Sequence, residues 1–347
     1  MALKIKPRSK ETFWDKVSSQ SKGSQDGFVT AIKNFENFCM EKHGKVDIIP
    51  DMKELENSQV IDILQSWIKW NSNLAPSTMK VFFSRLKKYL HYMGIKLDSQ
   101  DVKNELEFRR NIEEEKHGLT IDEIHTIFKD LHYDTRLVLT CQLSSLMRIG
   151  EIVQIRKKNL LLDGLNIIVK IPPTIAKRNK GRTTFFSKEA SALLRVKLRG
   201  LSDNDLVFVS NENPRRAEIN IQKKLRLALE KCGLNMRDSS GKLYLINTHS
   251  FRAYGITKLS RHDPNYARRL AGQKGYLDQY DRLSLDEKFE LYEKYEYELT
   301  IDQTKRDKVK IEQLEEDKKM EMRVMSEKLE SFQGVIKEMQ KRIDEKD

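Results

Sequence analysis

The spacing of apolar residues changes twice along this chain of 347 residues, and these changes limit what it can fold into. Between residues 8 and 112 the apolar residues recur at helical intervals of three and four, as in "DGFVTAIKNFENFCMEK". Two later runs, "LNIIVKI" and "RTTFFS", have the composition of short strands. Beyond residue 300 the spacing is that of a heptad repeat. We therefore expect a mainly α-helical chain with a small β-hairpin or sheet in an α+β domain.

The same patterns divide the chain into regions. We predict a helical domain over residues 8–112, a polar linker over 113–118, an α+β domain over 119–298 and an amphipathic tail over 301–347. The α+β domain is expected to open with the helix "LTIDEIHTIF", because Thr120 and Glu123 have the spacing of a capping box.

The tail carries apolar residues at alternating intervals of three and four. They are Met322, Met325, Leu329, Phe332, Ile336, Met339 and Ile343. This repeat predicts a coiled coil through which copies of the chain associate, or a long amphipathic helix that packs on its own domain.

The chain is strongly basic, with a formal charge of +12. Residues 301–347 contain 12 Lys+Arg and 13 Asp+Glu, a net charge of −1, so the first 300 residues carry +13. Such an excess favours a polyanionic partner, most simply double-stranded DNA, over the alternative of an anionic membrane surface. No apolar run reaches the roughly 18 residues of a membrane span, so we expect no membrane partner.

One predicted helix, "APSTMKVFFSRLKKYLHYMG", presents a basic face. Its members are Lys80, Arg85, Lys87 and Lys88. Pro76 near its start and Gly94 at its end mark the helix boundaries. We predict that this face binds DNA phosphates, although a basic face exposed only to solvent has the same pattern.

The cysteines and the N-terminus indicate the compartment. Cys39, Cys141 and Cys232 lie far apart and have neither metal-ligand spacing nor that of a disulfide framework. The first residues, "MALKIKPRSK", lack the apolar stretch of a signal peptide. We expect a reduced, cytoplasmic, DNA-associated protein that needs no metal and no cofactor.

Cutting a DNA strand without a metal requires fixed positive charges, a nucleophile and a general acid. Guanidinium groups suit the phosphate because they stay charged and bind two oxygens at once. Arg148 ends an apolar helical pattern in "LSSLMRIGEIVQI", where it needs an anionic partner such as Glu151. In "NTHSFRAYG", His249 and Arg252 are three residues apart, on one face of a helix capped by Asn247 or Thr248.

Taken together, four stretches resemble the tyrosine recombinases, the family of the phage integrases and Xer-type enzymes. They are "LMRIGEIVQI", "IAKRNKGRTTFFS", "THSFRAYG" and "LAGQKGYLDQYDRLS", in the family's order, over most of residues 120–298. The stretch "GYLDQYDRLS" is most similar to the archaeal branch. The resemblance implies that residues 119–298 are the catalytic domain and residues 8–112 a domain that clamps DNA.

The resemblance also implies roles for individual residues. Arg148 and Arg252 would clamp the non-bridging phosphate oxygens, with Glu151 supporting the first arginine. Lys177, on the expected hairpin, would protonate the leaving 5′ oxygen. His249 would hydrogen-bond the phosphate and help to take up the proton of the nucleophile. Lys180 and Arg182 are expected to contact DNA beside Lys177, and Lys180 stays open as an alternative for its role.

The nucleophile should be a tyrosine near the end of this domain. The candidates are Tyr276, Tyr280, Tyr292, Tyr295 and Tyr297. Tyr280 fits the archaeal pattern best, and Tyr276 is second. The chain departs from the family at Gln273, where histidine is usual and tryptophan also occurs. Glutamine donates a hydrogen bond but cannot shuttle a proton, so proton transfer would have to use other groups.

The resemblance implies a site-specific recombinase or integrase, such as a mobile element encodes, that forms a 3′-phosphotyrosine intermediate. It is expected to act as a homo-oligomer, a tetramer on paired DNA sites. The helix pattern after Tyr280 is expected to pack on a neighbouring subunit. Two alternatives stay open: a type IB topoisomerase-like enzyme that nicks and rejoins DNA, and a DNA-binding assembly protein with a degenerate site. Accessory proteins and the target sequence are not determined by these patterns.

Overall fold

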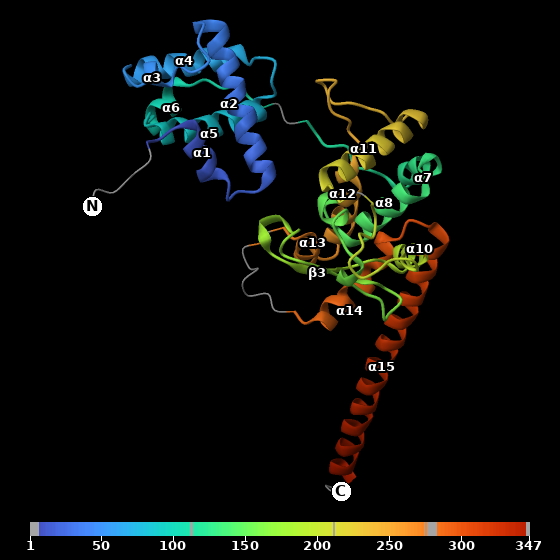
Figure 1. Ribbon diagram of the computed structural model, residues 1–347. Coiled ribbons are helices and arrows are strands. Elements are labelled where there is room, and N and C mark those ends of the chain that lie inside the picture. Colours follow the sequence, from blue (N-terminus) through green and yellow to red (C-terminus); the bar gives the residue numbers. More distant parts are fainter. Residues whose placement is uncertain (1–6, 112–113, 211, 274, 276–282, 345–347) are drawn as a thin grey trace, which may run out of the picture. The chain divides into compact units, whose positions relative to one another are not determined.

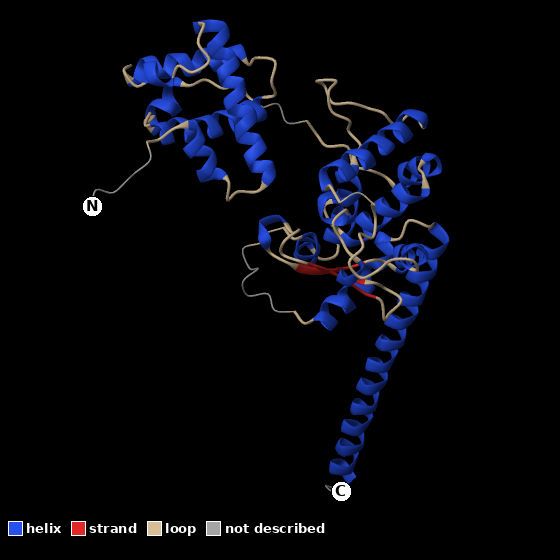
Figure 2. Cartoon of the chain, viewed as in Figure 1, coloured by secondary structure: helices blue, strands red, loops and turns tan. Residues whose placement is uncertain are grey.

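The structure, a computed structural model, describes residues 7–111, 114–210, 212–273, 275 and 283–344. The chain divides into two compact units, Met1–Glu114 and Glu115–Asp347 (Figure 1). Helices make up most of both units, and a small antiparallel sheet belongs to the second (Figure 2). The predicted fold class, mainly helical with a small sheet, is confirmed.

The described part of the first unit is helical. Its helices are α1 (Lys10–Val17), α2 (Lys22–His43), α3 (Ile49–Met52), α4 (Asn57–Trp70), α5 (Pro76–Met93) and α6 (Ser99–Glu105). Helix α5 has the predicted boundaries. Pro76 occupies the first helical position, where its missing N–H costs nothing, and Gly94 ends the helix at a φ of 104°.

Helices α2 and α5 pack against each other around an aromatic core. Trp67 of α4 is fully buried, and its ring meets Phe35 edge-to-face at 5.5 Å. The indole N–H donates to the side chain of Asn34 over 2.8 Å, so this buried polar group is satisfied. Aromatic burial therefore holds the first unit together.

The basic face of α5 is only partly as predicted. Lys80 and Lys88 are exposed, and Lys87 is half-buried. Arg85 lies elsewhere, because its guanidinium packs over Gly27 of α2, where a Cβ would collide with Arg85 Cζ. Arg85 thus fills the space left by a missing side chain between two helices, and its predicted contact with DNA phosphates stays a prediction.

The second unit surrounds the sheet with helices. Its strands are β1 (Leu160–Leu161), β2 (Ile168–Ile171) and β3 (Arg182–Phe185), and its 3₁₀ turns are η1 (Lys157–Asn159), η2 (Lys177–Asn179) and η3 (Glu296–Leu299). Its helices are α7 (Ile121–Asp130), α8 (Tyr133–Ser145), α9 (Ile149–Ile152), α10 (Lys188–Leu198), α11 (Pro214–Lys231), α12 (Thr248–Ser260), α13 (Pro264–Ala271), α14 (Leu285–Tyr295) and α15 (Gln303–Asp344).

The sheet is antiparallel in the order β1-β2-β3, and Val169 pairs with Thr184 across β2 and β3. Side chains alternate between its faces. Ile168 and Phe185 join one hydrophobic cluster, and Val169 and Ile171 join another. Both faces of the sheet are therefore buried, which fixes its register and the direction in which the β2–β3 hairpin projects.

The predicted start of α7 is confirmed. The Thr120 side chain accepts from the amide of Glu123 at 3.2 Å, and the Glu123 carboxylate accepts from the amide of Thr120 at 2.8 Å. The reciprocal bonds satisfy two of the amides that a helix start leaves free. This helix is the first regular element of the second unit.

Helix α14 packs on its own chain. The ring of Phe289 lies 5.4 Å from Phe185 of β3, and that of Tyr292 lies 5.1 Å from it. The Tyr292 hydroxyl donates to the Ser144 carbonyl at 3.0 Å, deep in the core. Within this single chain the helix after Tyr280 thus covers the sheet, and its expected packing on a neighbouring subunit stays a prediction.

The start of the tail belongs to the body of the second unit. Ile301 is 4% exposed and lies in the same hydrophobic cluster as Phe185. The amides of Ile301 and Asp302 donate to the half-buried Glu189 carboxylate at 2.7 and 3.1 Å. Residues 301 and 302 of the predicted amphipathic tail therefore anchor it to the body of the second unit.

Farther along α15 the apolar side chains are exposed. Among the described side chains these include Ile311, Met322, Met325, Leu329, Phe332 and Ile336. Met339 and Ile343 lie outside the described side chains. The described apolar residues of the heptad repeat therefore do not pack on the core of their own domain.

Cys39, Cys141 and Cys232 are unpaired, and the first two are buried. No described helix is long and apolar enough to cross a membrane. The described residues also contain no cluster of three or more His, Cys, Asp or Glu side chains that could hold a metal ion.

Two truncations should separate the anchor from the exposed helix. A chain ending at residue 300 loses the buried Ile301 side chain and the amides that bind Glu189, and should lose about 2–5 kcal/mol of unfolding free energy. A chain ending at residue 310 keeps both and should unfold like the full chain. Urea unfolding followed by circular dichroism measures the difference, and equal loss in both chains would contradict the assigned anchor.

Candidate active site

Arg148 is presented by a sharp turn at the end of the buried helix α8. Leu146 follows the helix with a φ of 55°, in the left-handed region that a leucine rarely adopts. The turn breaks the helix before Arg148, which then caps α9. Such a conformation costs on the order of 1–3 kcal/mol and persists only where the surroundings impose it. Here the buried Leu146 side chain and the hydrogen bond from Arg252 Nη1 to its carbonyl impose it.

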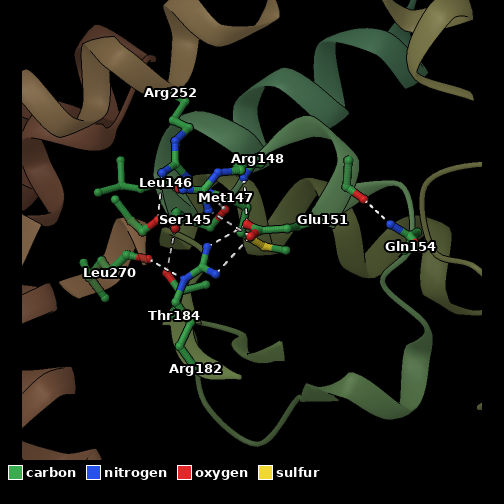
Figure 3. A network of polar contacts seen from close by, with 12 residues as sticks. Ser145, Leu146, Met147, Arg148, Glu151, Gln154, Arg182, Thr184, Arg252 and Leu270 are labelled. Atoms are coloured by element: carbon green, nitrogen blue, oxygen red, sulfur yellow. Dashed lines mark hydrogen bonds and ion pairs between the residues drawn. The ribbon is translucent and has the colours of Figure 1, made fainter. Parts of the chain in front are cut away.

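The Glu151 carboxylate lies between two guanidinium groups (Figure 3). It accepts from the amide of Arg148 at 2.9 Å and from Arg148 Nη1 at 3.1 Å. Arg182 of β3 donates to both of its oxygens, at 3.1 and 2.7 Å. Burial raises the pKa of Glu151, but the hydrogen bonds and charges of Arg182 and then Arg148 outweigh burial and lower it. Glu151 is therefore ionised at neutral pH.

Arg252 is held in the core beneath this pair. It is 1% exposed, and its guanidinium donates to the carbonyl of Leu146 and, at 2.7 Å, to that of Ala271. Its Nε has no hydrogen-bond partner among the described residues. Burial, followed by the charge of Arg148, lowers its pKa to about 10, so Arg252 stays protonated at pH 7. The site thus contains a buried positive charge without an anionic hydrogen-bond partner in the described chain.

His249 stands at the start of α12, which is capped by the Asn247 side chain through the amide of His249 at 2.8 Å. The imidazole is exposed on the side of the cleft. Desolvation, and then the charges of Arg252, Lys116 and Arg148, lower its pKa. A neutral imidazole at pH 7 can accept a proton.

An open cleft of about 510 Å³ brings most of these groups together. Arg148, Lys177 and His249 line it from α9, η2 and α12. Glu151 also reaches its wall. Three of the predicted catalytic residues, separated by up to 101 positions in the sequence, therefore share one surface.

The hairpin places its two lysines differently. Lys177 begins η2 and belongs to the lining of the cleft, whereas Lys180, which is also exposed, does not. Arg182, expected beside them as a DNA contact, is 12% exposed and bonded to Glu151 and to the Leu270 carbonyl. The guanidinium of Arg182 is thus engaged inside the protein, and its predicted contact with DNA stays a prediction.

The C-terminal part of the predicted site is described only in part. Gln273 is exposed directly after Gly272, and its amide donates to the Arg268 carbonyl at 2.9 Å. Tyr276 and Tyr280 lie outside the described residues. The other three candidates lie away from the cleft: Tyr292 is buried on Ser144, Tyr295 stacks on His262 at 4.7 Å, and Tyr297 meets the edge of the same imidazole.

Sequence reasoning missed four polar residues that line the cleft: Gln142, Gln154, Glu218 and Thr248. Gln142 is 1% exposed, and its Oε1 has no partner among the described residues. Glu218 approaches where Gly150 has no side chain, since a Cβ there would lie 2.5 Å from Glu218 Oε1. The sequence shows that Gly150 lies two residues after Arg148. It does not indicate that α11, which carries Glu218, packs against this glycine.

Comparison with known proteins finds a family to which part of this chain is similar. Residues 117–268 match the model of the phage integrase family. A search of curated protein sequences found no match to the chain.

Solved structures show the fold over a larger part of the chain. The XerH site-specific recombinase bound to difH substrate is 16% identical, with a TM-score of 0.54 over 81% of each chain. A lambda integrase (75–356) dimer bound to a COC′ core site is 12% identical, with a TM-score of 0.55 over 79% of this chain and 97% of that one. The Tn1549 transposon integrase in complex with transposon right end DNA is 13% identical, with a TM-score of 0.54 over 80% and 95%.

These identities establish similarity of fold and nothing finer. The stretch that matches the family model contains Arg148, Lys177, His249 and Arg252. Residues 117–268 are therefore similar to the phage integrase family, and the chain has a fold similar to that of the solved recombinase and integrase structures.

Proposed function

We propose that this chain is a site-specific DNA recombinase, or integrase, that cuts and rejoins DNA through a 3′-phosphotyrosine intermediate. The observation that carries the proposal is the cleft in which Arg148, Lys177 and His249 meet beside the buried Arg252. The cationic groups of the site outnumber its carboxylates, so the site is short of negative charge, which a phosphodiester supplies.

In the proposed mechanism the scissile phosphate lies over Arg148 and Arg252. Each guanidinium donates to non-bridging oxygens, and its charge stabilises the pentacoordinate transition state, in which negative charge accumulates on those oxygens. Because the arginines are held by Glu151 and by backbone carbonyls, they need not reorganise as that charge develops. The protein residues thus supply the charge stabilisation, and the proposal requires no metal.

The covalent step exchanges one phosphoester for another. The tyrosine oxygen attacks phosphorus and forms the new P–O bond, while the bond to the 5′ oxygen breaks. Lys177 donates a proton to the departing oxygen, and His249 helps to take up the phenol proton. Tyr280 is the proposed nucleophile and Tyr276 the second candidate; Gln273 would donate a hydrogen bond to the phosphate. Attack by the freed 5′-hydroxyl of the same or another strand reverses the chemistry.

The partners follow from the same account. Lys80, Lys87, Lys88 and Lys180 are proposed to contact phosphates of double-stranded DNA. Because two strands must be exchanged between paired sites, the active form is proposed to be a homo-oligomer, a tetramer on DNA. Similar structures were solved with a substrate, a core site or transposon-end DNA, one of them as a dimer, which supports this assembly for the chain. The archaeal-type pattern at "GYLDQYDRLS" supports the choice of Tyr280.

Two alternative functions differ from a recombinase in the site pairing or the catalytic residues that they require. A type IB topoisomerase-like enzyme would share the chemistry but need no pairing of sites. The similarity to recombinase structures covers about four fifths of this chain, which favours recombination. A degenerate DNA-binding assembly protein is favoured only by Gln273, whereas the buried, unneutralised Arg252 argues against it.

Covalent trapping on a nicked, suicide DNA site tests the proposal. The wild-type chain should form an adduct in the presence of EDTA, and intact mass spectrometry should show the mass of protein plus the 3′-terminated strand. Tyr280→Phe should abolish the adduct, because it removes the attacking oxygen, and Tyr276→Phe should keep it. Loss only in Tyr276→Phe would move the nucleophile, and no adduct from wild-type protein on bound DNA would exclude both enzymatic functions.

Arg148→Ala should separate binding from chemistry. DNA affinity should stay within about threefold, whereas single-turnover cleavage should fall by about 10²–10³, the usual effect of removing one preorganised donor. Arg252→Lys should behave similarly, and it avoids the cavity that alanine would leave at this buried position. Arg156→Gln, at an arginine–glutamate pair outside the cleft, is the control. Equal loss of binding and cleavage in Arg148→Ala would contradict its role.

The pH dependence of kcat/KM should report His249. Its pKa in the free protein is lowered, so the imidazole is neutral at pH 7 and becomes protonated only below its ordinary value near 6.5. The rate should therefore fall on the acid side at a pH below about 6.5, and His249→Gln should lower the rate and remove that limb. An identical acid limb in the variant would show that another group titrates.

The exposed face of α15 is proposed to form a coiled coil with the tail of a second copy. Its near-zero net charge removes the electrostatic obstacle to such pairing. Sedimentation should therefore show a smaller assembly for the chain ending at residue 310 than for the full chain, with single-turnover cleavage preserved. The same mass for both chains would contradict the coiled coil.

A further inference from the structure

We infer that Arg182 is a positioning residue of the phosphate site: it neutralises the Glu151 carboxylate so that the charge of Arg148 stays available to the DNA. The inference rests on the proposed function and extends it. It assigns Arg182 a role within the protein, in place of the DNA contact that its position on the hairpin suggests.

The contacts of Arg182 are directed inward. All three guanidinium nitrogens donate within the protein: Nη1 and Nη2 to Glu151, and Nε to the Leu270 carbonyl at 2.9 Å. The side chain is 12% exposed, compared with 29% for Arg148. An arginine with every nitrogen engaged and so little surface has little to offer a phosphate, whereas Arg148 keeps more of its guanidinium open at the cleft.

The two arginines bind the same carboxylate unequally. Arg182 forms a two-pronged pair with Glu151, whose shorter bond is 2.7 Å, while the Arg148 side chain makes one bond of 3.1 Å. Two-pronged pairs are the stronger arrangement. Without Arg182, the buried carboxylate would have Arg148 as its only side-chain partner among the described residues, and the resulting ion pair would cancel the charge that the phosphate needs.

Arg182 also fixes the end of α13. Its Nε holds the Leu270 carbonyl, and its guanidinium packs against Gly272, where a Cβ would lie 2.8 Å from Cζ. The Arg182 side chain thus connects β3 and Glu151 to the C-terminal end of α13. The next carbonyl there, that of Ala271, accepts a hydrogen bond from Arg252.

A charge-removal cycle tests this role. It compares Arg182→Gln, Glu151→Gln and the double variant with wild-type protein, and Arg156→Gln serves as the matched control. Three quantities are measured on one suicide DNA site: affinity as a function of salt, the single-turnover rate of adduct formation at saturating DNA, and the final amount of adduct.

Arg182→Gln should bind DNA within about threefold of wild type with an unchanged salt slope, because its charge does not meet a phosphate. Its rate should fall by about 10–100-fold, the usual effect of losing a group that orients a site residue, while the final amount of adduct stays at the wild-type level. Adding Glu151→Gln removes the carboxylate that captures Arg148, so the double variant should be at least about threefold faster than Arg182→Gln alone.

The contrary results are distinct. A salt slope reduced by about one, together with weaker binding, would identify Arg182 as a phosphate contact. If the double variant forms the adduct no faster than Arg182→Gln, the proposed coupling of Arg182 to Arg148 through Glu151 would be contradicted. A lower amount of adduct at an unchanged rate would mean that Arg182 only stabilises the fold. Absence of an adduct from wild-type protein would overturn the proposed function itself, whereas each of the other results leaves that function standing.

Discussion

The candidate site depends on one buried carboxylate. Glu151 accepts from the amide and guanidinium of Arg148 and from both terminal nitrogens of Arg182. A buried carboxylate is stable only when it is paired and hydrogen-bonded, and these donors meet that requirement. The same bonds join the start of α9 to strand β3, so the chemistry of one side chain connects the helical and sheet parts of the unit.

The backbone around this carboxylate is arranged to hold positive charge. The left-handed turn at Leu146 directs Arg148 toward the cleft, and the Leu146 carbonyl accepts a hydrogen bond from Arg252. Carbonyl dipoles orient Arg252 without neutralising it, and burial together with Arg148 lowers its pKa to about 10. In the folded protein the Arg252 guanidinium is thus buried and repelled by Arg148, and a bound phosphodiester would relieve both unfavourable effects. This is expected of a site that stabilises developing negative charge.

Features that depend on neighbouring residues could be predicted from the sequence. The capping box at Thr120 is local, and so is the three-residue spacing that joins Arg148 to Glu151. Features that depend on distant packing could not: Arg182 meets Glu151 only because of the strand register, and the Arg85 guanidinium packs over α2 because Gly27 has no side chain there. The turn at Leu146 also escaped prediction, since leucine disfavours that conformation.

The central claim is that Arg148 acts on the charge of the scissile phosphate. The most direct measurement compares cleavage of a normal site with cleavage of one whose scissile phosphate is a neutral methylphosphonate, by wild-type protein and by Arg148→Ala. If Arg148 offsets the charge of a non-bridging oxygen, the variant should cleave the neutral site at least about tenfold faster than the normal one, since the group it lacks is no longer needed. Equal, slow cleavage of both sites by the variant would contradict the account.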